Sequence, residues 1–142
     1  MILSDIKNVL STDGVFVSTT SGVSMYPLLR DRRDTIVVTP IQERLKKYDV
    51  ALFSRGDSYV LHRVIKVLPD SYVIRGDNCL MPEHVQDSAI LGKLTGIFRA
   101  EKEINMQGRS YKLYSRFIVW LSPLVRLKLR LNFLFKRILN KK

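Results

Sequence analysis

The sequence predicts a mainly β fold of the α+β class, built from hairpins, with a short helix at its start and a basic amphipathic helix at its end. Runs of β-branched and aromatic residues, separated by turn residues, predict the hairpins. Leucines spaced alternately three and four residues apart predict the last helix. At 142 residues and 46% hydrophobic composition, the chain suits one domain with one modest core.

The first part of the chain predicts one helix and two strands. Apolar residues at helical spacing indicate a short amphipathic helix at residues 4–10. The β-branched stretch at residues 15–20 predicts a strand that leads into a turn around Ser24. A polar turn at residues 31–34 then precedes a strand at residues 35–39.

The middle of the chain predicts a series of hairpins. An Arg-Gly-Asp-Ser turn at residues 55–58 is the strongest hairpin signal, because Gly and Asp supply the backbone angles of a tight connection. The strands expected around this turn and the next are residues 50–53, 59–67 and 72–75. The polar residues 79–88 predict a loop over one end of the sheet. Residues 90–99 predict a further strand, with bulges at Gly92 and Gly96.

The chain divides into a body, residues 1–110, and a basic helical tail, residues 111–142. None of the 13 Asp and Glu residues lies beyond Glu103, whereas ten of the 24 Lys and Arg residues do, so the tail carries most of the net charge of +11. Pro123 suits the first turn of the tail helix or a kink in it. The apolar face of this helix is expected to comprise Leu124, Leu127, Leu131, Leu134 and Ile138.

The tail has three possible partners. An anionic membrane surface is favoured, because leucines and aromatic residues accompany the positive charges. Packing on the body comes second, and nucleic acid is the least expected partner. The longest charge-free run, residues 117–125, is far shorter than the roughly 20 residues of a bilayer span. The first ten residues lack the apolar run of a signal peptide, so we expect a cytoplasmic or peripherally membrane-associated protein.

Ser24 is the candidate nucleophile. It lies on a turn between Gly22 and Pro27, where a bent backbone displays a side chain instead of hiding it in a strand. A nucleophilic serine needs a proton acceptor, for which His62 is the candidate, and backbone N–H groups for the oxyanion. Gly22 and the Ser24 N–H are the candidate oxyanion contributors. Two histidines and one cysteine, widely spaced, predict no metal site, and no cofactor is expected.

Three short motifs occur in order along the chain: GVSMYP at residues 22–27, LHRVI at residues 61–65 and RGDN at residues 75–78. Together they resemble the motifs of type I signal peptidases and LexA-type self-cleaving repressors, which share one β-rich fold. The resemblance covers residues 17–99. It implies a serine endopeptidase with Ser24 as nucleophile and with His62 as general base, as in the histidine-type members. Ordinary signal peptidases also carry an N-terminal transmembrane anchor, which this sequence does not predict.

The acid that would orient His62 stays open among three candidates. Asp77 follows the third motif's glycine and could accept a hydrogen bond from the imidazole, as in a Ser-His-Asp triad. The resemblance implies an acid a few residues further along, which is Glu83 by simple offset, or Asp87 if the loop is longer. Asp77 and Glu83 rank equally, and Asp87 ranks below them.

The resemblance also implies the substrate, a peptide or preprotein from which a signal or leader segment is cleaved. Such a peptide would bind extended along a strand edge, with small side chains next to the scissile bond. Met25 is expected in the wall beside the nucleophile. Arg63 either binds a substrate carbonyl or, preferably, pairs with a turn carboxylate. Two alternatives stay open: a LexA-like self-processing regulator, and a noncatalytic membrane-surface module with the same fold.

Overall fold

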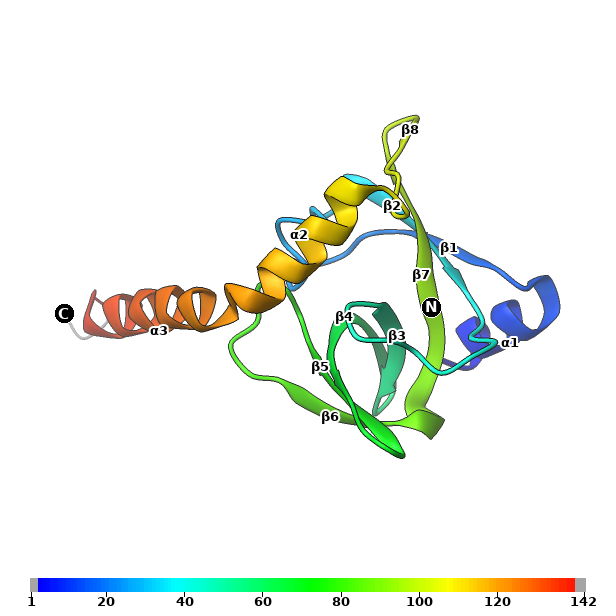
Figure 1. Ribbon diagram of the computed structural model, residues 1–142, viewed down its shortest axis with the longest axis horizontal. Coiled ribbons are helices and arrows are strands. Elements are labelled where there is room, and N and C mark those ends of the chain that lie inside the picture. The colour runs from blue at the N-terminus through cyan, green and yellow to red at the C-terminus, as the bar shows by residue number, and fades with distance from the viewer. Residues whose placement is uncertain (1–2, 140–142) are drawn as a thin grey trace.

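The computed structural model describes residues 3–139, which form a curled antiparallel β-sheet with three α-helices around it (Figure 1). This architecture confirms the predicted mainly β, α+β class. The helices are α1 (Leu3–Asp13), α2 (Arg109–Trp120) and α3 (Ser122–Leu139), with a 3₁₀ turn η1 (Asp87–Ala89). The strands are β1 (Phe16–Thr19), β2 (Asp34–Thr39), β3 (Val50–Arg55), β4 (Ser58–Val67), β5 (Ser71–Arg75), β6 (Glu83–Gln86), β7 (Ile90–Arg99) and β8 (Lys102–Glu103).

The strands follow the order β1-β2-β7-β3-β4-β5-β6, and β8 pairs with β7. The predicted hairpin is confirmed, since Arg55 of β3 is paired with Ser58 of β4. Both predicted bulges are confirmed as well: the register of β7 shifts next to Gly92, against β3, and next to Gly96, against β2. At Gly92 an added Cβ would lie 2.7 Å from the Thr39 carbonyl oxygen, so this close approach of two strands requires glycine.

The prediction of a loop over residues 79–88 is wrong in its second half. Residues Glu83–Gln86 form strand β6, which pairs antiparallel with β5. Only Val85 of this strand is buried, so its polar sequence carries too weak an alternation to be recognised as a strand. The pairing matters for function because it fixes the position of Glu83, opposite Ile74.

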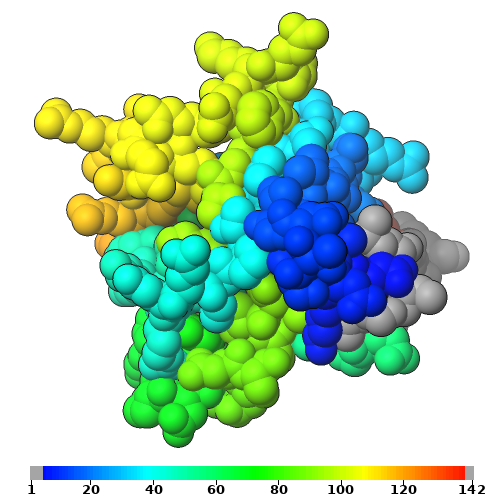
Figure 2. Space-filling view, turned by 90° about the vertical axis from the view of Figure 1, so that its right-hand side faces the viewer, coloured from blue at the N-terminus to red at the C-terminus, as the bar shows by residue number. Residues whose placement is uncertain are grey.

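Strand β3 is buried on both faces, which explains its uninterrupted apolar sequence. Val50 and Leu52 belong to a core shared with α1, β1 and the turn after β1. Ala51 and Phe53 belong to a second core on the opposite face. Because β3 lies between β7 and β4 in a sheet that curls, each of its faces meets other apolar side chains. Figure 2 shows α1 over the side of the molecule where it packs against β1 and β7.

The two C-terminal helices differ in how they meet the body. Helix α2 is packed on the body through the buried residues Ser115 and Ile118, whereas no residue of α3 is fully buried and α3 projects away (Figure 1). The domain boundary predicted after residue 110 therefore falls in the first turn of α2, a helix that packs on the body. Pro123 lies in the first turn of α3, as predicted. Within residues 3–139, no helix combines the length and apolar character that crossing a bilayer demands.

Candidate active site

Ser24 lies in the segment that joins β1 to β2, which we name the Ser24 turn (residues 20–33). Gly22 has a φ of +87°, in the left-handed region that favours glycine, so the chain can bend sharply just before the serine. The Tyr26 N–H donates to the Val23 carbonyl at 3.1 Å, and Ser24 itself is half-buried. The local sequence thus displays the hydroxyl on a bend, as predicted.

The buried carboxylate of Asp34 holds the Ser24 turn in place. It accepts hydrogen bonds from the Arg30 N–H at 3.0 Å, from Arg33 Nε at 2.8 Å and from Arg99 Nε at 3.2 Å. Burial alone would raise the pKa of Asp34, but these hydrogen bonds outweigh it and lower the pKa. The backbone closes the turn too, because the Thr20 N–H donates to the Asp34 carbonyl at 2.8 Å.

His62 lies on β4 with its ring almost entirely buried. Its Nδ1 lies 3.1 Å from Oε1 of Glu83, and its ring packs edge-on to Phe53 at 5.9 Å between centroids. Glu83 reaches the ring from β6 and also forms an ion pair with Arg55 at the end of β3. Of the three candidate acids, Glu83 is therefore the one in contact with His62.

Burial lowers the pKa of His62 below its ordinary value. The Glu83 carboxylate raises the pKa, and the Arg55 charge lowers it, so burial decides the direction. A lowered pKa keeps the imidazole neutral at neutral pH. With Nδ1–H donating to Glu83, the lone pair of Nε2 is free to accept a proton.

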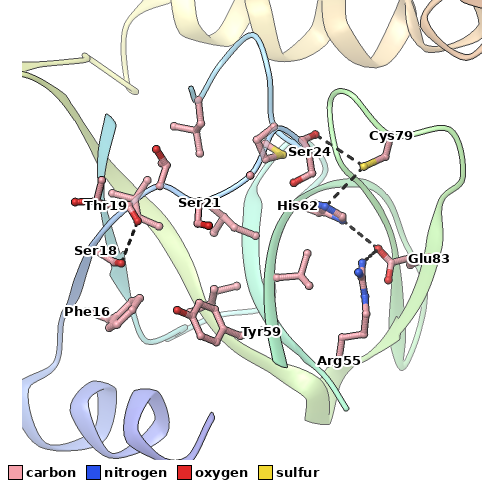
Figure 3. A pocket seen from close by; sticks show the side chains of 18 of the residues that line it. Phe16, Ser18, Thr19, Ser21, Ser24, Arg55, Tyr59, His62, Cys79 and Glu83 are labelled. Carbon is pink, nitrogen blue, oxygen red and sulfur yellow. Dashed lines mark hydrogen bonds and ion pairs between the residues drawn. The ribbon is translucent and has the colours of Figure 1, made fainter. Parts of the chain in front are cut away.

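Gly76 brings the Ser24 turn and His62 together. A Cβ at this position would lie 2.6 Å from the Ser24 carbonyl oxygen and 3.0 Å from Nε2 of His62. The Asn78 N–H donates to the same Ser24 carbonyl at 2.9 Å. Figure 3 shows Ser24 and His62 at one end of a pocket, with Glu83 beyond the ring. Glycine is needed here for space, a role that could not be predicted from the sequence because the contacts join distant segments.

Cys79 is a neighbour of the site that the sequence did not predict. Its Sγ lies 3.9 Å from Nε2 of His62 and 3.9 Å from the Ser24 carbonyl oxygen. Burial and the nearby Glu83 charge raise the pKa of the thiol. The thiol is therefore protonated at neutral pH, which makes it a poor nucleophile. A single cysteine in a polar stretch gave no signal beyond the lack of an internal disulfide.

The pocket is a groove of about 690 Å³ between β1 and β4, and it ends at Ser24 and His62. Within the described chain, β1 pairs only with β2, and residues 58–62 of β4 pair only with β3, so each of these groove-lining strands has one unpaired edge. Phe16 and Tyr59 meet across the groove, with ring centroids 6.2 Å apart. The other apolar lining residues include Met25, Leu29, Ile36, Leu52 and Leu61, which places Met25 in the wall as predicted.

Arg63 and Asp77 lie on the other side of β4, away from this groove. Arg63 is fully buried and binds Asp77 through Nε and Nη2, both at 2.8 Å. Its Nη1 donates to Ser115 Oγ of α2 at 3.0 Å, and Tyr114 of the same helix donates to Asp77 at 2.9 Å. The structure therefore pairs Asp77 with Arg63 and not with His62. Of the two roles expected for Arg63, this contact favours pairing with a turn carboxylate over binding a substrate carbonyl.

Two further predicted residues have partners away from the imidazole. Asp87 pairs with Arg44 at 2.9 Å and does not contact His62. The Gly22 N–H donates to the Asp31 carboxylate at 2.8 Å, so this N–H is already occupied. Within residues 3–139, the Ser24 N–H has no acceptor, which leaves it as the available oxyanion donor. The same residues hold no group of three His, Cys, Asp or Glu side chains that could bind a metal ion.

Comparison of the sequence with models of known protein families finds no match, and comparison with curated proteins finds no match either. The resemblance to signal peptidases therefore stands on the three motifs alone.

Proposed function

We propose that this protein is a serine endopeptidase of the signal-peptidase type, with Ser24 as nucleophile and His62 as general base. One observation carries the proposal: Nε2 of His62 lies beside the Ser24 turn at the end of a groove, while Glu83 bonds to the opposite ring nitrogen. A serine, a neutral buried imidazole and a carboxylate in this order are the parts of a nucleophile-base-orienter triad.

In this mechanism, the Ser24 hydroxyl oxygen attacks the carbonyl carbon of a peptide bond, and Nε2 of His62 takes the hydroxyl proton. The Ser24 N–H donates to the oxyanion that forms. The C–N bond breaks as His62 gives the proton to the leaving amine, and the acyl group stays on Ser24 as an ester. Water then attacks this ester, with His62 again as base, and restores the free serine.

Glu83 takes the role of positioning residue. By accepting a hydrogen bond from Nδ1–H, it keeps the tautomer in which Nε2 can accept a proton, and it favours the imidazolium that forms during the reaction. Arg55 lies on the other side of Glu83 and holds the carboxylate toward the ring. Residues from β3, β4 and β6 thus act together on one side of the groove.

The substrate that fits the groove is an extended peptide. Two unpaired strand edges face it, from β1 and from residues 58–62 of β4, so a peptide strand could form backbone hydrogen bonds to both. The apolar lining around Met25 and Leu29 suits small or apolar side chains near the scissile bond. The motif resemblance supports a signal or leader peptide as the natural substrate.

The proposal is tested with a peptide library incubated with purified protein, in which mass spectrometry detects new termini. Ser24→Ala and His62→Ala should each lower kcat/KM by about 10⁴-fold or more. Ser11→Ala is the matched control, since Ser11 lies on α1 away from the groove. Cleavage that survives Ser24→Ala but is lost in Cys79→Ala would assign the nucleophile to the thiol instead.

The same experiment separates the alternatives. The intact mass of the protein, measured before and after incubation at alkaline pH, reports self-cleavage as expected for a LexA-like regulator. Full cleavage by both Ser24→Ala and His62→Ala would exclude the proposed mechanism.

We also propose that helices α2 and α3 bind an anionic membrane surface, which makes the protein a peripheral one. Large apolar side chains project from both helices, among them Trp120 at 74% exposure and Phe135 at 63%. Lys and Arg residues accompany them, and neither helix contains Asp or Glu. An apolar face with such charges suits anionic lipid, because each basic residue near the surface contributes about 1 kcal/mol.

Flotation with phosphatidylcholine vesicles, with or without phosphatidylglycerol, tests this partner. Binding should require phosphatidylglycerol, and Leu127→Glu should weaken it because Leu127 lies exposed on α3. Val67→Glu is the control, since Val67 is an exposed apolar residue of β4 outside these helices. Equal effects of the two substitutions would contradict a membrane role for α3.

A further inference from the structure

Arg75, the last residue of β5, is a buried cation that forms no hydrogen-bonded ion pair with the described residues. Its side chain is 2% exposed, and within residues 3–139 its Nε and Nη1 atoms have no hydrogen-bond partner. The nearest carboxylate in sequence, Asp77, already accepts two hydrogen bonds from Arg63 and one from Tyr114. A guanidinium buried in this way is costly unless an acceptor reaches it.

A second arginine with the same deficit lies on α3. Nε of Arg126 is buried and has no partner among the described residues, and its Nη2 reaches only Ser122 of its own helix, at 3.5 Å. Arg126 is half-buried, whereas the next arginine along the helix, Arg130, is exposed. The charge of Arg126 also acts on Arg75 of β5. Helix α3 begins beside the segment that follows β5 (Figure 1).

The two guanidinium groups act on each other. Burial lowers the pKa of Arg75, and the charge of Arg126 lowers it further. At the start of α3, the Leu121 carbonyl already accepts hydrogen bonds from the Leu124 and Val125 N–H groups. Two positive charges, from β5 and α3, thus act on each other, and Asp77, the acid whose charge also acts on Arg75, is already bonded to Arg63.

We propose that Arg75 and Arg126 form a phosphate-binding site at the junction of the body and α3. A phosphate group has several acceptor oxygens in a compact anion, so it can accept hydrogen bonds from both guanidinium groups at once. Arginine is the residue best suited to this contact. The phosphate could belong to a phospholipid headgroup or to free inorganic phosphate.

The position of the site gives it a consequence for the groove. Arg75 directly precedes Gly76, the residue that touches both the Ser24 carbonyl and His62. A bound phosphate would offset the repulsion between Arg75 and Arg126. It would thereby hold the segment that follows β5 against α3. The site itself does not depend on the proposed peptidase activity, because neither Arg75 nor Arg126 lines the groove.

The first arm of the test is thermal unfolding of the full chain in phosphate and in chloride buffers of equal ionic strength. Phosphate should raise the Tm of the wild type, since a ligand that binds only the folded state stabilises it. Arg75→Gln and Arg126→Gln should abolish the rise, and Arg130→Gln, one turn further along α3, should keep it. If Arg75→Gln does not fold, Arg126→Gln alone decides the result.

The second arm is flotation with phosphatidylcholine vesicles that contain phosphatidylglycerol. If the site takes a lipid phosphate, Arg126→Gln should weaken binding about tenfold more than Arg130→Gln does. If the two variants lose vesicle binding equally but phosphate raises the Tm of the wild type, the site binds free phosphate. No phosphate effect on Tm, combined with equal losses in flotation, would overturn the proposal. If Arg126→Gln and Arg130→Gln reduce vesicle binding equally, the proposed membrane role of α3 still stands. The membrane proposal and the phosphate-site proposal therefore fail separately.

Discussion

Two neighbouring residues of β4, His62 and Arg63, each pair with a carboxylate, but on opposite faces of the strand. His62 faces the groove and contacts Glu83, which is 30% exposed on its side chain. Arg63 faces α2 and contacts Asp77 in a pair that water does not reach. Successive side chains of a strand point to opposite faces, so one residue step separates a candidate catalytic pair from a structural one.

The difference between the pairs lies in how firmly each is held. The Arg63–Asp77 pair has two parallel hydrogen bonds, and Tyr114 and Ser115 of α2 complete it. The His62–Glu83 pair has one contact, at 3.1 Å, and Glu83 is partly exposed. We conclude that the first pair stabilises the fold, whereas the second is the pair to which we assign proton transfer in the proposed mechanism.

The largest expected effect is on stability. Asp77→Asn leaves the Arg63 guanidinium buried without its counterion, so the free energy of unfolding should fall by about 3–5 kcal/mol. Urea denaturation measures this change. Asp87→Asn is the control, because the Arg44–Asp87 pair is exposed and its loss should leave the free energy of unfolding nearly unchanged. Similar losses for both variants would show that the Arg63–Asp77 pair is not a structural centre.

The next effect is on turnover. Glu83→Gln removes the charge that orients His62, so kcat should fall about 100-fold, less than in a fully buried triad because Glu83 is partly exposed. Steady-state kinetics on a library-derived peptide measures the change. The free energy of unfolding should change by about 1 kcal/mol or less. A loss of stability as large as in Asp77→Asn would make Glu83 a structural residue.

Gly76 links the two faces, since it lies between Arg75 and Asp77 and leaves no room for a Cβ beside Ser24 and His62. Gly76→Ala would place a methyl group 2.6 Å from the Ser24 carbonyl and from Sγ of Cys79. Such overpacking should cost about 1–3 kcal/mol of stability, and it should displace the Ser24 turn and lower kcat. Gly56→Ala is a control for backbone strain, because Gly56 has a positive φ and no neighbour within 4 Å. Unchanged kcat in Gly76→Ala would contradict a close junction at this point.

The smallest effect is a shift in pH dependence. Activity requires neutral His62, so kcat/KM should rise with pH through a His62 pKa that lies below its ordinary value. Glu83 raises this pKa, so Glu83→Gln should move the acid limb to lower pH, by about one pH unit or less. Arg55 lowers it, so Arg55→Gln should move the limb to higher pH. A pH–rate profile of each variant measures both signs, and a shift in the same direction would contradict this account of His62.

Most strands and the outline of the site could be predicted from the sequence, because they depend on local signals. Glycine and aspartate at residues 55–58 predicted the hairpin, and Gly22 and Pro27 predicted a bend at Ser24. Strand β6 was missed because only Val85 among its residues is buried. Arg55 and Cys79 were missed because their contacts with Glu83 and His62 join segments that are distant in the chain.

The local features of the protein follow from its amino-acid sequence: the turn that carries Ser24, the hairpins, and the basic helix that follows the body. These depend on backbone preferences and hydrophobic spacing over a few residues. Which carboxylate contacts which residue of β4 depends on tertiary structure: Glu83 contacts His62, and Asp77 pairs with Arg63. That choice depends on strand register and on the pairing of β6 with β5, because a shift of one residue turns every side chain of a strand to the opposite face.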